Sequence, residues 1–210
     1  MQHTFVAEAE IVGELPDVVP TQMIIDEPSI SSGDWDFARD QGGPLTQAVL
    51  NKLEGLQSLA PENRQTRNIC IDTESQFMLL GQFPAIPGWH CDSPHVIEKN
   101  SADELFFVCS ISDQAGGVSQ TLFAVGSTTI LVDSEHLWQS VHRQAERSIL
   151  NRQLIADGKI VQFSMNTLHC PTACYNKGWR FWFRLAVTDR KPANKLLSRI
   201  QIYSPIESRD

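Results

Sequence analysis

Residues 178–185 read Gly-Trp-Arg-Phe-Trp-Phe-Arg-Leu, a stretch in which two kinds of side chain alternate. Because successive side chains of a β-strand point to opposite faces, one face of this strand would carry Arg180, Trp182 and Arg184. The other face would carry only apolar side chains, as a face packed into a core does. Two arginines beside a tryptophan make sense if their face lines a pocket for an anion.

Further short β-rich runs lie before and after this stretch, separated by turn residues. Alternation over residues 5–11 indicates one half-buried strand, and residues 31–34 and 40–43 are typical of turns. Many short strands joined by turns predict a mainly β protein with flanking helices, a sandwich or barrel of antiparallel strands. From residue 68 onward the predicted strands are residues 69–72, 76–83, 105–111, 121–125, 129–132, 159–165, 180–187 and 200–203, of which 180–187 overlaps the opening stretch.

Helical spacing of apolar residues occurs in two segments. The first begins at Pro44, which suits the first helical position, and ends at Leu56; we expect it to cover one face of a sheet. The second is residues 134–146. Without an internal repeat or linker, the sequence predicts a single domain over residues 1–210. Its parts are N-terminal strands and a covering helix (1–67), a β core (68–187) and a C-terminal extension (188–210).

Composition excludes several function classes. The chain has 210 residues and a formal net charge of −8, which disfavours binding to duplex nucleic acid because that requires a basic surface. No apolar run is long enough to cross a bilayer. Five cysteines without regular spacing do not form a disulfide framework. We therefore expect a cytoplasmic protein in a reducing compartment; the sequence carries no signal of its oligomeric state.

Three residues are candidate metal ligands. His90 and Asp92 are two positions apart, so in an extended segment both side chains point to the same face while Cys91 points away. His169 follows a predicted strand whose end could present it inward. Two imidazoles and one carboxylate form the facial triad that holds Fe(II) and leaves adjacent coordination positions open.

The ordered set His90, Asp92, His169 and Arg180 resembles the signature of the Fe(II)- and 2-oxoglutarate-dependent dioxygenases. That superfamily has a double-stranded β-helix (jelly-roll) fold, and the resemblance covers roughly residues 68–187. It implies antiparallel sheets covered by one or more N-terminal helices. It also implies that the triad is catalytic and holds Fe(II), which uses dioxygen to oxidise a substrate while 2-oxoglutarate becomes succinate.

The resemblance assigns further residues. Arg180, eleven positions after His169, would pair with the distal carboxylate of 2-oxoglutarate, and Arg184 is the competing choice or the anchor of an acidic substrate. A hydroxyl on a neighbouring strand, from Ser119 or Thr121, would assist that carboxylate.

Three further side chains are expected at the substrate pocket. Trp89 and Trp182 would form its walls, although large aromatic residues in a β core more often serve packing. His95 would lie at its rim. The substrate could be a small molecule, a peptide side chain or a single nucleobase.

Other interpretations stay open from the residues alone. Cys91, Cys170 and Cys174 could join the histidines in a zinc site, and Cys91 or Cys170 could act as a nucleophile. His136 and His142 lie on different faces of the second predicted helix, so they are not expected to share a metal. A cupin-like metal enzyme that does not use 2-oxoglutarate, and a jelly roll that only binds, are the alternative functions.

Overall fold

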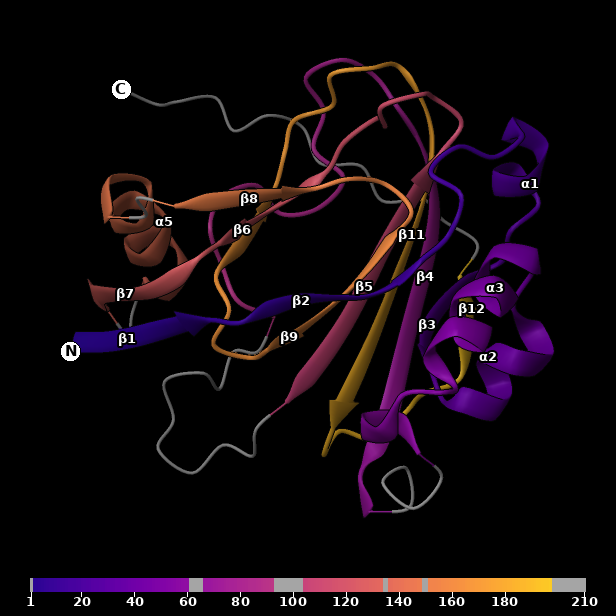
Figure 1. Ribbon diagram of the computed structural model, residues 1–210, viewed down its shortest axis with the longest axis horizontal. Coiled ribbons are helices and arrows are strands. Elements are labelled where there is room, and N and C mark those ends of the chain that lie inside the picture. The colour runs from indigo at the N-terminus through magenta and orange to yellow at the C-terminus, as the bar shows by residue number, and fades with distance from the viewer. Residues whose placement is uncertain (1, 61–65, 93–103, 134–135, 149–150, 198–210) are drawn as a thin grey trace.

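The computed structural model describes residues 2–60, 66–92, 104–133, 136–148 and 151–197. Over these residues the protein is mainly β, with antiparallel sheets and few helices (Figure 1). The largest sheet contains seven strands, a second sheet contains three, and a two-stranded ribbon pairs β1 (Gln2–Ala7) with β7 (Gly126–Leu131).

Every pairing between named strands in these sheets is antiparallel. The three-stranded sheet has the order β10 (His169–Pro171), β6 (Thr121–Ala124) and β8 (Arg152–Ile155). The seven-stranded sheet has the order β12 (Lys195–Leu197), β3 (Ser29–Gly33), β4 (Asn68–Met78), β11 (Gly178–Thr188), β5 (Leu105–Ser112), β9 (Lys159–Ser164) and β2 (Ala9–Glu14).

Strand β11 lies at the middle of the large sheet and pairs with β4 along eleven positions and with β5 along eight. Its alternation has the consequence expected from the sequence. The apolar face, with Phe181 and Phe183, is buried in a core. The opposite face, with Arg180 and Arg184, lines a cavity.

Three short helices cover the apolar face of the large sheet: α1 (Thr21–Ile25), α2 (Trp35–Gln41) and α3 (Pro44–Leu53). Figure 1 shows them together on one side of β4 and β11. Leu45, Val49 and Leu53 recur at helical spacing on α3 and are buried against the sheet. A short 3-10 helix, η1 (Gln57–Leu59), follows.

The other face of the large sheet packs against the small sheet. Phe106 of β5 stacks on Phe163 of β9, and Phe163 meets Phe123 of β6 edge to face. Helix α5 (Leu137–Ser148) packs against β7 and adds Val141 to this second core (Figure 1). The candidate metal ligands lie beside this core, between the two sheets.

Several predicted boundaries were wrong. Residues 69–72 and 76–83 were predicted as two strands, but one strand, β4, runs from Asn68 to Met78 because its backbone pairs with β11 at every one of these positions. The predicted turn at 31–34 is the end of β3, and Asp34 then caps α2 by accepting the Phe37 N–H. The predicted turn at 40–43 begins inside α2.

The N-terminal alternation also had the wrong interpretation. Residues 5–11 form parts of two strands, because β1 pairs with β7 whereas β2 (Ala9–Glu14) pairs with β9. The first predicted helix ends at Leu53 rather than Leu56, and α5 begins at Leu137. The predicted strand 200–203 lies outside the described residues. Helices α1 and α2 and strands β8, β10 and β12 had no predicted counterpart.

Among the described residues, no helix combines the length and the apolar character needed to cross a bilayer.

A buried carboxylate fixes the helical layer. Glu27 is 4% exposed, and its oxygens accept hydrogen bonds from the backbone N–H groups of Leu45 and Thr46 and from the Thr46 hydroxyl. These donors belong to the first turn of α3, where backbone N–H groups have no partner within the helix. A negative charge is also favourable at this end of a helix.

We expect Glu27→Ala to lower the free energy of unfolding by about 3 kcal/mol, because it leaves several buried donors without an acceptor. Urea denaturation of Glu27→Ala and of Asp26→Ala, which changes the adjacent exposed acid, provides the comparison. The control should change stability by less than about 0.5 kcal/mol. Equal effects of the two substitutions would contradict the capping role.

Candidate metal centre

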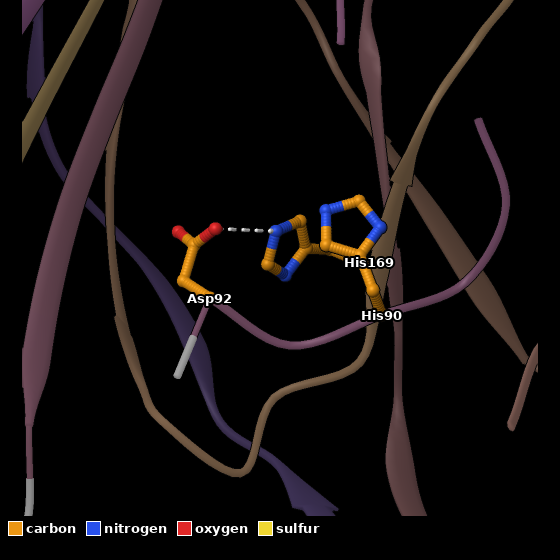
Figure 2. Close-up of side chains that lie close together, drawn as sticks. All are labelled: His90, Asp92 and His169. Atoms are coloured by element: carbon orange, nitrogen blue, oxygen red, sulfur yellow. Dashed lines mark ion pairs between the residues drawn. The ribbon is translucent and has the colours of Figure 1, made fainter. Parts of the chain in front are cut away.

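Three side chains from distant parts of the chain meet at one point. The ligand atoms of His90, Asp92 and His169 all lie within 4.8 Å of one another. The His169 Nε2 is 3.6 Å from the Asp92 Oδ1, and the two imidazole centroids are 4.7 Å apart. Figure 2 shows the carboxylate of Asp92 facing the ring of His169, with the ring of His90 next to the ring of His169. One ion could therefore contact all three residues.

A backbone bridge brings the two histidines together. His90 and His169 form an antiparallel pair in which each backbone N–H donates to the carbonyl of the other, at 3.0 Å in both directions. Side chains of directly opposed residues in such a pair project from the same face. Strand β10 carries His169 into this pair and bonds β6 on its other side.

Both imidazole rings are oriented by backbone carbonyls. The Nδ1 of His90 is 2.7 Å from the carbonyl of Gly88, and the Nδ1 of His169 is 3.1 Å from the carbonyl of Thr167. A carbonyl oxygen only accepts, so we assign the proton to Nδ1 in each ring. The lone pair of each Nε2 is then available to a metal, the usual way in which outer hydrogen bonds set the tautomer of a ligand.

The protonation states suit metal binding. Burial lowers the pKa of His90 from 6.5 to about 4, with a further contribution from His169. Burial by itself would raise the pKa of Asp92, but the neighbouring His169 and Arg184 outweigh it and hold the pKa well below its usual range. At neutral pH the site therefore offers a neutral imidazole at His90 and an ionised carboxylate, the forms that coordinate metals.

Arg184 is held by two carboxylates. Its Nη2 donates to the Asp72 Oδ2 at 2.7 Å, its Nε donates to the same oxygen at 3.3 Å, and its Nη1 lies 3.4 Å from the Asp92 Oδ1. Asp72 faces Arg184 directly in the register of β4 and β11, and its Oδ1 accepts the Ser32 N–H. Arg184 thus links a candidate ligand to the large sheet.

Arg180 has different surroundings. It is 3% exposed, and its Nη2 donates to the Ser110 hydroxyl at 2.7 Å. Its Nε has no hydrogen-bond partner among the described residues. Thr121 lines the same cavity as Arg180. Ser119, the other predicted hydroxyl, instead donates to the Thr172 carbonyl at 2.6 Å and is not part of the cavity lining.

A cavity of about 890 Å³ opens over the three candidate ligands. Its wall is mostly apolar, with a few convergent polar groups, the usual character of a small-molecule site. Trp182 and Trp89 both line it, but Trp89 is 1% exposed and also belongs to the second core. His95 lies outside the described residues. Other lining residues include Ile30, Glu74, Pro84, Ile86, Val108, Trp138, Gln139, Pro171 and Leu197.

Helix α5 fastens the segment that carries His90 and Asp92. The Trp89 N–H donates to the His142 Nδ1 at 3.2 Å, and the Trp89 indole N–H donates to Glu146 at 2.7 Å. Gly88 has a φ of +99°, and a Cβ there would lie 3.0 Å from the His142 ring. Within the described part of the chain, the metal-compatible group does not include His136 or His142.

The cysteine alternatives receive no support from the geometry. Cys91 and Cys170 pack in the second core and Cys174 in a small third cluster. Burial raises the pKa of Cys170 to about 12 and raises the pKa values of Cys91 and Cys174. A nucleophile or a zinc ligand needs a thiolate, which these surroundings disfavour. Among the described residues, the metal-compatible group is His90, Asp92 and His169.

Sequence reasoning missed Ser110, Asp72 and the α5 contacts. Asp72 and Ser110 lie on strands that were predicted, but only the register of β11 with β4 and β5 pairs them with the arginines. A charged residue inside an otherwise apolar strand run, as at Asp72, was the available signal. His142 and Glu146 gave no such signal because their role depends on where α5 packs.

Comparisons with known proteins identify no family. No protein-family model matches the sequence, and no curated protein matches it. Solved structures that match include an N-substituted L-amino acid dioxygenase from Burkholderia ambifaria. That protein is 13% identical in sequence, the match covers 89% of this chain and 95% of the other, and the TM-score is 0.40. At this similarity the match assigns neither a family nor an activity.

We expect the purified protein to bind one equivalent of Co(II), a spectroscopic substitute for Fe(II), with visible absorption bands. His169→Ala and Asp92→Ala should weaken binding by more than about 100-fold, beyond the 10- to 100-fold typical of residues that only orient a ligand. His136→Ala, which removes an exposed histidine, is the matched control. Undiminished binding by either ligand variant would contradict the site.

A double-mutant cycle tests whether Asp72 holds Arg184. We expect a coupling of about 1 to 2 kcal/mol between Arg184→Met and Asp72→Asn in urea denaturation, because the pair is largely removed from solvent. The pair of Lys159 and Glu14, in which the glutamate side chain is 66% exposed, should couple by less than about 0.5 kcal/mol. A coupling near zero for Arg184 and Asp72 would mean that the arginine is free to bind something else.

Proposed function

We propose that this protein is an Fe(II)- and 2-oxoglutarate-dependent oxygenase that hydroxylates a substrate in the cavity over its metal centre. The observation that carries the proposal is the meeting of two imidazoles and one carboxylate at the wall of a large cavity. The same cavity wall carries a buried arginine with a donor to spare. A jelly roll that only binds an anion could use the arginine but would have no need of the three metal-compatible side chains.

The donor set fits ferrous iron. Two imidazoles and one carboxylate, grouped on one side of an open cavity, are the donor set of the facial triad in non-haem iron oxygenases. His90, Asp92 and His169 would hold the ion. When bound, the iron would supply dioxygen activation, coupled to decarboxylation of 2-oxoglutarate to succinate. The chain itself supplies the carbonyl contacts that aim both histidines and the Arg184 contact that positions Asp92.

The order of strands supports a jelly roll, the fold of these oxygenases. Strands β4, β11, β5 and β9 are neighbours in the large sheet, while the His90 segment, β10, β6 and β8 are neighbours opposite them. Along the chain these eight segments pass repeatedly from one sheet to the other. Eight strands in two antiparallel sheets are the jelly-roll arrangement.

Arg180 is the better candidate for the carboxylate anchor of 2-oxoglutarate. Arg184 already contacts Asp72 and Asp92, whereas the Arg180 Nε has no acceptor among the described residues. A guanidinium binds a carboxylate through two parallel N–H donors, and burial strengthens that contact. Ser110, which accepts from the Arg180 Nη2, orients the guanidinium, and Thr121 offers a hydroxyl in the same cavity.

Anaerobic titration with Fe(II) and 2-oxoglutarate tests the function. We expect the visible charge-transfer band of chelated 2-oxoglutarate in the wild type. Arg180→Gln should raise the 2-oxoglutarate concentration at half-saturation by about 10- to 100-fold, the effect of losing a charge-assisted hydrogen bond. Lys177→Gln, which removes an exposed cation near the start of β11, is the control.

Two results would contradict the proposal in different ways. If Fe(II) binds and 2-oxoglutarate produces no band, the chain is a metal protein of another kind. If the band forms but Arg184→Gln weakens it while Arg180→Gln does not, the cosubstrate is anchored by the other arginine.

A further inference from the structure

The described wall of the cavity has an excess of negative charge. It contains the carboxylates of Asp72, Glu74 and Asp92 and the guanidinium groups of Arg180 and Arg184. The histidines in the wall add no charge in the metal-bound site. His90 and His169 coordinate as neutral imidazoles. His142 accepts the Trp89 N–H at Nδ1, which a protonated ring could not do.

Binding of Fe(II) and 2-oxoglutarate together would not change the net charge of the described wall. A ferrous ion brings two positive charges, and fully ionised 2-oxoglutarate brings two negative charges. The three carboxylates and two guanidiniums of the wall then leave one net negative charge. Ion pairing within the wall does not alter this total. Asp157, a buried acid whose charge acts on Arg180, could only make it more negative.

Neither arginine is available to an anionic substrate. Arg184 is bonded to Asp72 and contacts Asp92. Arg180 is committed to the cosubstrate in the function proposed above. An acidic substrate would therefore be a second anion, after 2-oxoglutarate, beside a wall whose described arginines both have partners. In a partly desolvated site, an anion without a cationic partner is unfavourable in free energy. This disfavours the possibility, raised by the sequence, that Arg184 anchors an acidic substrate.

Two tryptophans of the cavity wall lie near the candidate ligands. The Trp138 ring on α5 is 6.5 Å from the His90 ring, edge to face. The Trp182 ring lies beside Arg184, whose guanidinium carbon is 5.5 Å from the ring centroid and whose Nη1 contacts Asp92. Both tryptophans are half-buried and line the cavity. Both indoles therefore offer an aromatic surface to a molecule bound in the cavity.

The described wall of the cavity also contains exposed apolar side chains and one further acid. Ile86 is 61% exposed and Leu197 is 45% exposed, and both line the cavity. Glu74 faces Trp182 directly in the register of β4 and β11, and its charge also acts on Arg180. A carboxylate beside an indole provides both an ion-pair partner and an aromatic face for an ammonium group.

We infer that, if the proposed function holds, the substrate combines an apolar, flat body with an ammonium group. The body packs against Trp138 and Trp182, and the ammonium group lies toward Glu74. The site accepts an uncharged molecule of the same shape less well and rejects its carboxylate analogue. The inference deepens the proposed function by giving the chemical class of its substrate.

Three probes share a phenyl ring on a short alkyl chain and differ in the charge of the end group: 3-phenylpropylamine, 3-phenylpropan-1-ol and 3-phenylpropanoate. Binding to the protein loaded with Co(II) and 2-oxoglutarate is followed by tryptophan fluorescence and calorimetry. We expect the amine to bind at least about tenfold more tightly than the carboxylate, with the alcohol between them, as one charge acting across several ångströms predicts. Glu74→Gln should abolish the advantage of the amine and leave the alcohol unchanged. Trp182→Leu should weaken all three.

Three results in the loaded protein would overturn the inference. The carboxylate could bind most tightly, the three probes could bind equally, or none of them could bind at millimolar concentration. An unchanged amine preference in Glu74→Gln would overturn the role of Glu74. Repeating the titrations without 2-oxoglutarate distinguishes failure of the substrate inference from failure of the proposed function. With Co(II) alone the site has a net positive charge, so the carboxylate should become the preferred probe. If 2-oxoglutarate does not change the order, it does not occupy the site, and the proposed function itself fails.

Discussion

The backbone pair between His90 and His169 is the constraint on which the site depends. Two reciprocal N–H···O bonds of 3.0 Å join segments that are far apart in the chain. They place both imidazoles on one side of the small sheet, and Asp92 follows two residues later. A shift of one residue in this pairing would turn a histidine to the opposite face, because side chains alternate along a strand. The metal centre therefore requires this register.

Strand β11 connects that pair to the rest of the protein. One face of it closes the core beneath α1, α2 and α3, and the other face presents two arginines to the cavity. The register with β4 pairs Arg184 with Asp72, and β5 provides Ser110 to Arg180. The two arginines thereby acquire different roles although they lie on the same face of one strand. Helices α1, α2 and α3 pack on the apolar face of the large sheet, and α5 holds Trp89 through a hydrogen bond to Glu146.

The sequence predicted the features that depend on local spacing. The alternation of β11, the helix starting at Pro44 and the pair His90 and Asp92 can all be read from neighbouring residues. Features set by contacts across the fold could not be predicted. The polar residues around Thr73 interrupt the apolar pattern of β4, yet the strand continues because its backbone pairs with β11 at each of these positions. Similarly, the commitment of Arg184 to Asp72 follows from strand register, which a single sequence does not contain.

The most direct test of the central claim is a crystal structure of the iron-loaded protein, with an anomalous difference map at the iron edge. The account predicts one strong peak within coordination distance of the Nε2 atoms of His90 and His169 and of one Asp92 oxygen. The open side of the ion should face the cavity that contains Arg180. A peak at the cysteines, or at a position that touches only one of the two histidines, would contradict the account.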